Sequence, residues 1–277
     1  IAHQALLERK GIDAEIVPNV FDFSQSPWEL DDYNRDFRRE IGAAPEDIIL
    51  LQATRVLDRK GIELAVDLAG ILNTPYFRSR LESQRLYDGR SFSSSGRIIL
   101  VCAGYVEQFG ITGNYVSALK ERARERKAEI VFTGEWVRHT RDSTGDTKIY
   151  SLWDSYVHAD MVTYPSWWEG WGNQFIEAVF ARQPVYLFEY PVYLTDLKPA
   201  GFDVISLGSE LGPKDRHGLV TLPEDVLNRA AGEAVTFLTD PARRKKTTDR
   251  NYRIAEERFS TRKLKEQITR LIGPLPA

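Results

Sequence analysis

The chain has 277 residues, of which 42% are apolar and 28% charged, so it can bury a substantial core and is not disordered. Its net charge of −3 and isoelectric point near 5.9 give no global basic field, which argues against nucleic acid as a partner. The single cysteine, Cys102, lies in an apolar run, which excludes a disulfide framework or a thiolate metal site and suits a reducing cytosol.

No apolar run approaches the roughly 18 residues of a membrane-spanning helix, and no signal peptide is visible. The chain begins at Ile1 and its single methionine is Met161, so we expect a fragment or a processed form. The expected location is the cytoplasm, with peripheral contact to a membrane left as an open alternative.

Short β-rich runs alternate with amphipathic helical runs along the chain. Strands are expected at residues 47–56, 97–105, 128–134, 160–165 and 183–189, with a sixth candidate at 202–207. Helices are expected at 60–72, 114–127 and 147–159, from near residue 173, and in three stretches between 222 and 272. This alternation predicts an α/β architecture, a Rossmann-like parallel sheet with helices on both faces.

Two polar stretches, about 76–96 and 138–148, look like insertions into this pattern, and the first 30 residues look like an entry segment. In parallel sheets of this kind, ligands bind at the carboxyl ends of the strands. The loops that follow the strands are therefore the places to look for a site.

The loop after the fourth strand opens the segment TYPSWWEGWGNQFIEAVFARQPVYLFEYP (163–191). Pro165 ends the strand, and Gly170 and Gly172 leave the following backbone free of side chains. Asn173 is the expected N-cap of the next helix. The free N–H groups and positive dipole of that helix would face the crevice and favour a phosphate or another anion.

Two glutamates belong to this segment. Glu177 is expected in the first helical turn, where it could simply complement the dipole, and Glu169 could be a solvated loop residue. Three tryptophans between residues 167 and 171 surround Glu169, however. Carboxylates accept hydrogen bonds from sugar hydroxyls while aromatic rings cover C–H faces, so the loop suggests a polyhydroxylated ligand.

The loop after the first strand carries TRVLDRKGI, with Arg55 near the strand end and Lys60 beside Gly61 at the next helix. In a parallel sheet it opens on the same edge as the loop at 165–172. Two cations would then meet one helix N-terminus, a combination that can neutralise a diphosphate. The alternative is that both are surface charges, with Asp58 as a local partner.

Together these residues resemble a known family. Glu169 and Glu177, with seven residues between them, match the E-x7-E motif of retaining GT-B glycosyltransferases of the glycogen-synthase-like family 4. PSWWEGWGNQFIEAVFARQPV resembles that family's P-S-x-x-E-G-F-G-x-x-x-x-E-A-x-A-x-G-x-P-V signature, and RVLDRKG resembles its R-x-x-x-x-K-G segment. Weaker landmarks follow in the right order: IVPNVFDF (16–23), VFTG (131–134) and YVHAD (156–160). The resemblance covers roughly residues 16 to 190.

The resemblance implies the C-terminal, donor-binding half of a GT-B fold, in which two Rossmann-like domains face each other across a cleft. It divides the chain into an interdomain entry segment (1–30), a nucleotide-sugar-binding domain (31–258) and a C-terminal helix (259–277) returning toward an N-terminal domain. The implied activity is retaining transfer of a hexose from a nucleotide diphosphate sugar to an acceptor that is a glycan, a lipid-linked sugar or a small molecule.

The resemblance also assigns roles to residues. Arg55 and Lys60 would grip the donor diphosphate and stabilise the leaving nucleotide, Glu169 would bind sugar hydroxyls near the anomeric centre, and Glu177 would bind the ribose hydroxyls. No metal and no cofactor is implied, because the cations and the helix dipole replace a divalent ion. The remaining donor-binding candidates are Gly170, Trp171, Gly172, Asn173 and Gly134.

The chain departs from the family pattern in ways that leave the sugar open. Trp171 stands where the family has Phe, Arg182 and Gln183 replace the expected glycine before the Pro-Val pair, and FEYPVYLTDLKPAGFDVI replaces a glycine-rich segment. The base and the acceptor are not specified either. Tyr190, Tyr193 and Asp196 could shape the sugar pocket or serve packing.

Two alternatives compete with a transferase. GWGNQF (170–175) contains G-x-G without the third glycine of a dinucleotide fingerprint, and Glu189 lies at the distance expected of a ribose-binding acid, so an NAD-binding oxidoreductase is one. Phe175 in place of the packing glycine weighs against it. The second alternative is a non-catalytic module that only binds a nucleotide sugar.

Overall fold

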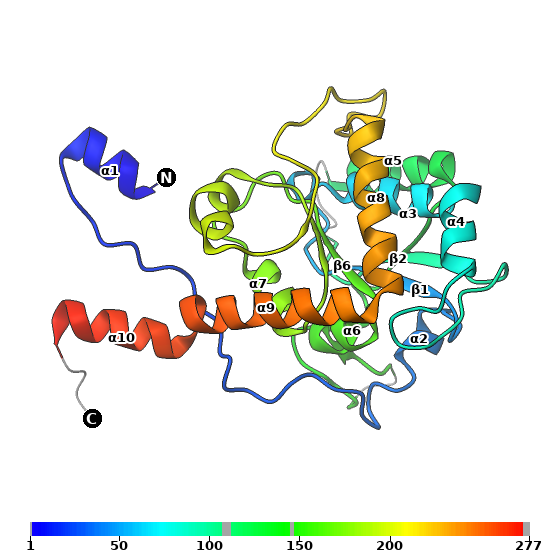
Figure 1. The fold of residues 1–277 in the computed structure, drawn as a ribbon, viewed down its shortest axis with the longest axis horizontal. Coiled ribbons are helices and arrows are strands. Elements are labelled where there is room, and N and C mark those ends of the chain that lie inside the picture. The colour runs from blue at the N-terminus through cyan, green and yellow to red at the C-terminus, as the bar shows by residue number, and fades with distance from the viewer. Residues whose placement is uncertain (1, 107–111, 145–146, 274–277) are drawn as a thin grey trace.

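The computed structural model describes residues 2–106, 112–144 and 147–273. A six-stranded, fully parallel sheet forms its centre, in the order β3-β2-β1-β6-β7-β8 (Figure 1). The strands are β1 (Ile48–Gln52), β2 (Ile98–Cys102), β3 (Glu129–Phe132), β6 (Met161–Tyr164), β7 (Val185–Leu187) and β8 (Ile205–Ser206). All six predicted strands and the parallel sheet are thus confirmed.

Side chains of the strands alternate between two apolar clusters, one on each face of the sheet. Ile48 and Leu50 of β1 belong to one cluster, and Ile49 and Leu51 belong to the other. The helices that contribute to the first cluster are α3 (Ile62–Leu72), α4 (Pro75–Glu82), α5 (Thr112–Arg126) and α8 (Glu224–Thr239). Those that contribute to the second are α2 (Phe37–Glu40), α6 (Leu152–His158), α7 (Asn173–Phe180) and α9 (Pro241–Phe259). Helices therefore cover both faces, as predicted.

Shorter elements complete the chain: 3-10 turns at Asp58–Lys60 and Lys198–Ala200, a π-helical turn at Tyr193–Leu197, and the two-strand pair β4 (Val137–Arg138) and β5 (Tyr150–Ser151). Helices α1 (Ala2–Lys10) and α10 (Thr261–Ile272) extend away from the sheet on the same side of the molecule (Figure 1). In the part of the chain that the structure describes, no helix is both long and apolar enough to span a bilayer.

The predicted helix at 147–159 is wrong in its first third. Tyr150 and Ser151 form β5, and α6 begins only at Leu152. Ser151 caps this helix in a reciprocal capping box with Asp154, whose side chain accepts from the Ser151 amide at 2.7 Å. The cap satisfies the first-turn N–H groups and so sets the helix start.

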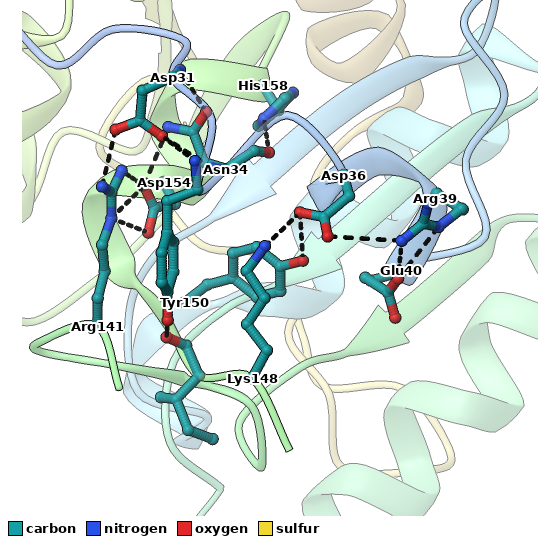
Figure 2. A network of polar contacts seen from close by, with 12 residues as sticks. Asp31, Asn34, Asp36, Arg39, Glu40, Arg141, Lys148, Tyr150, Asp154 and His158 are labelled. Carbon is teal, nitrogen blue, oxygen red and sulfur yellow. Dashed lines mark hydrogen bonds and ion pairs between the residues drawn. The ribbon is translucent and has the colours of Figure 1, made fainter. Parts of the chain in front are cut away.

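A polar network that includes Arg141 and Lys148 connects the described part of the polar stretch 138–148 to α2, α6 and the segment before α2 (Figure 2). Arg141 donates to both carboxylate oxygens of Asp154, at 3.1 and 3.0 Å through Nε, and pairs with Asp31 at 2.7 Å. Asn34 donates to the same Asp154 carboxylate at 3.0 Å. The expected insertion is therefore anchored at the start of α6.

Residues 21–28 of the expected entry segment pack against α6 and α7. Phe21 contacts Phe180 with ring centroids 5.0 Å apart, and Trp28 stacks on Trp153 at 4.3 Å. The Phe21 amide donates to the carbonyl of Phe259 at 2.8 Å. This packing holds α7, whose N-terminus is part of the site described next.

Candidate active site

The site lies where the order of the sheet reverses. From β1 the chain adds β2 and β3 on one side of the sheet, and then β6, β7 and β8 on the other. β1 and β6 are therefore parallel neighbours, and the loops that follow them leave the same edge of the sheet. Ligands of open α/β sheets bind in the crevice at this switch point. Gly61 brings the two loops together: with φ at 60°, a Cβ here would lie 2.3 Å from the Pro165 carbonyl oxygen.

Glu169 joins the two loops through a buried ion pair. Lys60 Nζ donates to Oε1 of Glu169, and the two residues are only 4% and 9% exposed. Burial on its own would raise the pKa of Glu169, but the hydrogen bond and charge of Lys60 outweigh it and keep that pKa below its usual value. Burial lowers the pKa of Lys60 despite its partner. Lys60 and Glu169 therefore place two paired charges on the wall of the crevice.

Arg59 also binds Glu169, and nothing in the sequence pointed to it. Its Nη1 donates to Oε2 of Glu169 at 3.1 Å and to the Trp168 carbonyl at 2.8 Å. The Trp167 amide donates to the Arg59 carbonyl at 3.1 Å, and the Trp167 indole donates to the Asp58 carbonyl at 3.1 Å. Backbone and side-chain bonds therefore fasten the two loops to each other.

Helix α7 starts at this crevice, although two details differ from expectation. Gly172, with φ at 117°, is the N-cap, because Asn173 is already helical. Glu177 lies in the second turn rather than the first, since the helix starts at Asn173 and its first turn holds no acid. Asn173 instead accepts a hydrogen bond from Asn19 at 3.0 Å. Asn173 and Gln174 at the start of α7 line the crevice, and their N–H groups precede the first intrahelical bond, which the Phe175 amide donates to the Gly172 carbonyl at 3.1 Å.

A cavity of about 220 Å³ collects most of these groups. It is lined by Asn19, Arg55, Arg59, Lys60, Glu169, Trp171, Gly172, Asn173 and Gln174. Three cations and one carboxylate leave a local excess of two positive charges beside a helix N-terminus, which suits an anion carrying two negative charges.

A second cavity of about 270 Å³ lies next to the first and shares Arg55 and Gln174 with it. Its other walls come from the segments after β1 and β2, from β4 and the residue after it, and from the start of α6: Ala53, Ala103, Gly104, Tyr105, Val137, Arg138, His139 and Leu152. Arg55 therefore lies at the boundary between the two cavities.

Three of the predicted site residues lie outside the walls of the first cavity. Gly170 is exposed one residue from Glu169. Gly134 packs under the loop after β2, where a Cβ would lie 3.1 Å from the Gly104 carbonyl oxygen. Glu177 is half-buried and accepts a hydrogen bond from Tyr156 Oη at 3.3 Å, and burial raises its pKa to about 7.

Unsatisfied polar groups gather beside the cavity. Among the described residues, Tyr164 Oη, Ser166 Oγ and Trp171 Nε1 are buried and make no hydrogen bond of good geometry, although Tyr164 and Ser166 lie close enough to the Glu169 carboxylate to interact with it. Such groups are rare in folded proteins and are found where a ligand or water supplies the missing partner. Tyr190 and Tyr193, in contrast, are buried packing residues, and Tyr190 Oη donates to the Trp171 carbonyl at 2.8 Å.

No family model matches the chain. Two curated relatives, the mannosylglucosylglycerate synthases of Petrotoga mobilis and Thermotoga maritima, are each 37% identical to it, over 244 and 274 residues. The matches cover 87% and 99% of this chain but only 54% and 60% of the relatives. The chain therefore spans little more than half the length of the curated relatives it matches.

Solved structures of glycosyltransferases have the same fold. HepE of Anabaena, solved in complex with UDP and glucose, matches with a TM-score of 0.61 at 15% identity, over 99% of this chain and 61% of HepE. The C-terminal domain of LpcC, a group 1 family glycosyl transferase of Francisella tularensis, matches with a TM-score of 0.52 at 12% identity, over 87% of this chain and 99% of that domain. The resemblance to GT-B glycosyltransferases and the Rossmann-like fold of their C-terminal half are thus confirmed.

Proposed function

We propose that this chain binds a nucleoside diphosphate sugar and forms the donor side of a retaining, metal-independent hexosyltransferase. The observation that carries the proposal is the meeting of Lys60, Arg59 and Glu169 beside the N-terminus of α7, inside the crevice at the switch point of the sheet. The 37% identity to two mannosylglucosylglycerate synthases supports it.

We assign each residue to one part of the donor molecule. Arg55 and Lys60, with the first N–H groups of α7, bind the diphosphate and stabilise the charge that grows on it as the bond to the sugar breaks. Glu169 accepts hydrogen bonds from sugar hydroxyls. Glu177 lines neither cavity, so its place at the ribose rests on the family resemblance alone. The crevice toward the ends of β1 and β2 takes the base.

Metal independence is proposed because the positive charge needed at the diphosphate is already present on side chains. The cavity holds an excess of two positive charges, which equals the charge of the diphosphate in a nucleotide sugar. A helix N-terminus adds its partial charge at the same place. Arginine and lysine at fixed positions stabilise a departing phosphate without a divalent ion.

The relatives suggest which substrates to test first. Their name describes a product with mannosyl, glucosyl and glycerate parts. We therefore propose mannose as the transferred hexose and a small sugar–glycerate conjugate as the acceptor. We place the activity in the cytoplasm, in keeping with the buried, unpaired thiol of Cys102.

The other two interpretations make different predictions. A non-catalytic module would bind the same nucleotide sugar but would neither transfer nor hydrolyse it. An NAD-binding enzyme would need Glu189 at a ribose, but Glu189 is buried and accepts hydrogen bonds from Lys198 at 2.7 Å and Ser206 at 2.8 Å. Nothing in the part of the chain that the structure describes favours the oxidoreductase.

The test is calorimetry with UDP, GDP, ADP, their hexose conjugates and NAD, each with and without magnesium. We expect one nucleoside diphosphate and its hexose conjugate to bind with the same affinity in both buffers. Binding of NAD alone, or of no nucleotide, would overturn the proposed function. Binding that requires magnesium would overturn metal independence and leave the donor site in place.

A further inference from the structure

We propose that Arg59 is a positioning residue for Glu169, which it holds in place while Lys60 turns toward the diphosphate of the donor. The inference deepens the proposed function and rests on it. It starts from the way in which the two oxygens of one carboxylate are shared between two cations.

Lys60 can bind either Glu169 or the diphosphate, and the two contacts compete for its ammonium group. Its ammonium group is buried against Oε1 of Glu169 and also lines the cavity that would hold the diphosphate. A phosphate oxygen entering the cavity draws the same ammonium, because both partners are anions and the site is shielded from water. Oε1 of Glu169 then loses much of its strongest contact at the moment when the carboxylate has to bind sugar hydroxyls.

Arg59 is placed to keep the carboxylate from moving. It contacts the other oxygen, Oε2, and the same Nη1 reaches the Trp168 carbonyl next to Glu169. Its own backbone is fixed by the amide of Trp167. A planar guanidinium anchored to both a side chain and the neighbouring backbone holds a carboxylate in one orientation, which a flexible ammonium does not.

The charges support a division of labour between the three cations. With a donor bound, two negative charges of the diphosphate and one of Glu169 face Arg55, Arg59 and Lys60. Arg55 lies between the two cavities, where it can face the diphosphate, and Arg59 faces Glu169. Lys60 lies between the two anions and serves both.

The test compares a bare nucleoside diphosphate with its hexose conjugate. GDP and GDP-mannose, or UDP and UDP-glucose, whichever pair the unaltered chain binds, are titrated into Arg59→Met, Arg59→Lys and Glu169→Gln. We expect Arg59→Met to leave the affinity for the bare diphosphate within about threefold and to weaken the hexose conjugate roughly tenfold more. Arg59→Lys should recover part of this loss, and Arg59→Met should add little in the Glu169→Gln background.

Arg124→Met is the matched control, because the Arg124 side chain is 69% exposed on α5 and pairs with Glu121 one helical turn earlier, away from the site. Equal loss of both ligands in Arg59→Met would make Arg59 a phosphate ligand and overturn the inference, as would no loss of either. If the unaltered chain binds no nucleotide, the proposed function itself fails, and this is seen before any variant is made.

A measurement without ligand separates the two failures further. Carbon-13 NMR of the Glu169 carboxyl should show a higher pKa in Arg59→Met than in the unaltered chain, because the charge of Arg59 helps to lower that pKa. An unchanged titration midpoint would show that Arg59 does not hold the carboxylate, whatever the chain binds.

Discussion

Lys60 and Glu169, 109 residues apart in the sequence, form a buried ion pair that closes the loop after β1 onto the loop after β6. Burying two charges is costly unless they are paired and hydrogen-bonded, and breaking such a pair leaves one charge without compensation. The pair therefore contributes more to ligand binding, by holding both charges in the crevice, than to the stability of the fold.

Replacing Lys60 by Met should weaken nucleoside diphosphate binding by tenfold to a hundredfold. The stem of the side chain remains packed, while a charge-assisted hydrogen bond worth about 1.5–3 kcal/mol to the diphosphate is lost. Calorimetry with the best-binding diphosphate measures it. Arg55→Met should act in the same direction. Lys245→Met serves as the control, because Lys245 is 76% exposed on α9.

In an enzyme that turns over, the same Lys60 substitution should slow transfer by about a hundredfold or more, the usual cost of one lost contact to developing charge. Turnover near that of the unaltered enzyme would show that Lys60 does not stabilise the leaving group. The assignment of this cavity to the donor diphosphate would then be wrong.

Gly172 and Gly170 should respond very differently to the same substitution. A Cβ on Gly172 would lie 2.1 Å from Tyr190 Oη, and its φ of 117° is unfavourable for any side chain, whereas a Cβ on Gly170 would meet nothing within 4 Å. We expect Gly172→Ala to lower the free energy of unfolding by about 2–4 kcal/mol and Gly170→Ala to change it by about 0.5 kcal/mol or less.

Urea unfolding of both variants measures this difference. Because Tyr190 also donates to the Trp171 carbonyl, a shifted Tyr190 should disturb the cavity wall, so Gly172→Ala should bind nucleotide more weakly as well. Equal stability of the two variants would mean that the backbone at Gly172 relaxes without cost, despite the close approach of Tyr190 Oη.

The sequence predicted the sheet well because strands buried on both faces have to be continuously apolar. Ile48 to Leu51 alternate between the two apolar clusters, so a polar residue at any of these positions would bury a polar group in a core. The ends of the strands were predicted less accurately: the predicted first strand ran to Val56, whereas β1 ends at Gln52 and Val56 makes an isolated bridge to Val106. The strand β5 was missed because two residues have no periodicity to detect.

At the site, the sequence could bring loops together but not individual side chains. The rule that carboxyl ends of parallel strands share one edge placed Lys60 near Glu169. Arg59 was missed because an arginine in a polar loop looks like any solvated charge. Asn19 was missed because its partner, Asn173, is 154 residues away and the packing that joins them leaves no local pattern.

Donor binding should strengthen as the pH rises from 6 to 8. Burial raises the pKa of Glu177 to about 7, so the group is mostly protonated at pH 6 and ionised at pH 8. A carboxylate accepts hydrogen bonds from ribose hydroxyls better than a carboxylic acid, so a single titration near 7 predicts up to about a tenfold gain in affinity over this range.

The measurement uses the hexose conjugate rather than the free diphosphate, because the conjugate has no phosphate group that titrates between pH 6 and 8. Glu177→Gln should bind weakly at all pH values and show no such rise. A variant that keeps the full pH dependence would place the titrating group elsewhere, and would remove the argument for Glu177 at the ribose.

Stability should fall with rising pH because of Glu63, a carboxyl group that is 2% exposed on α3. It accepts hydrogen bonds from the Val220 amide at 3.0 Å and from Tyr115 Oη at 2.5 Å, yet burial raises its pKa from 4.5 to about 7. Between these two values the folded state binds a proton that the unfolded state has released. The free energy of unfolding therefore decreases as the pH rises through this window and levels off above it.

The shift of Glu63 corresponds to about 3 kcal/mol in total, of which about 2 kcal/mol falls between pH 5.5 and 7.5. Urea unfolding at these two pH values should show the unaltered chain losing about 2 kcal/mol more than Glu63→Gln, whose amide does not titrate. Other groups, Glu177 among them, contribute equally to both proteins, so the difference isolates Glu63. Parallel pH curves would mean that Glu63 is already ionised in the folded state near pH 5.5, held by its two donors against the cost of burial.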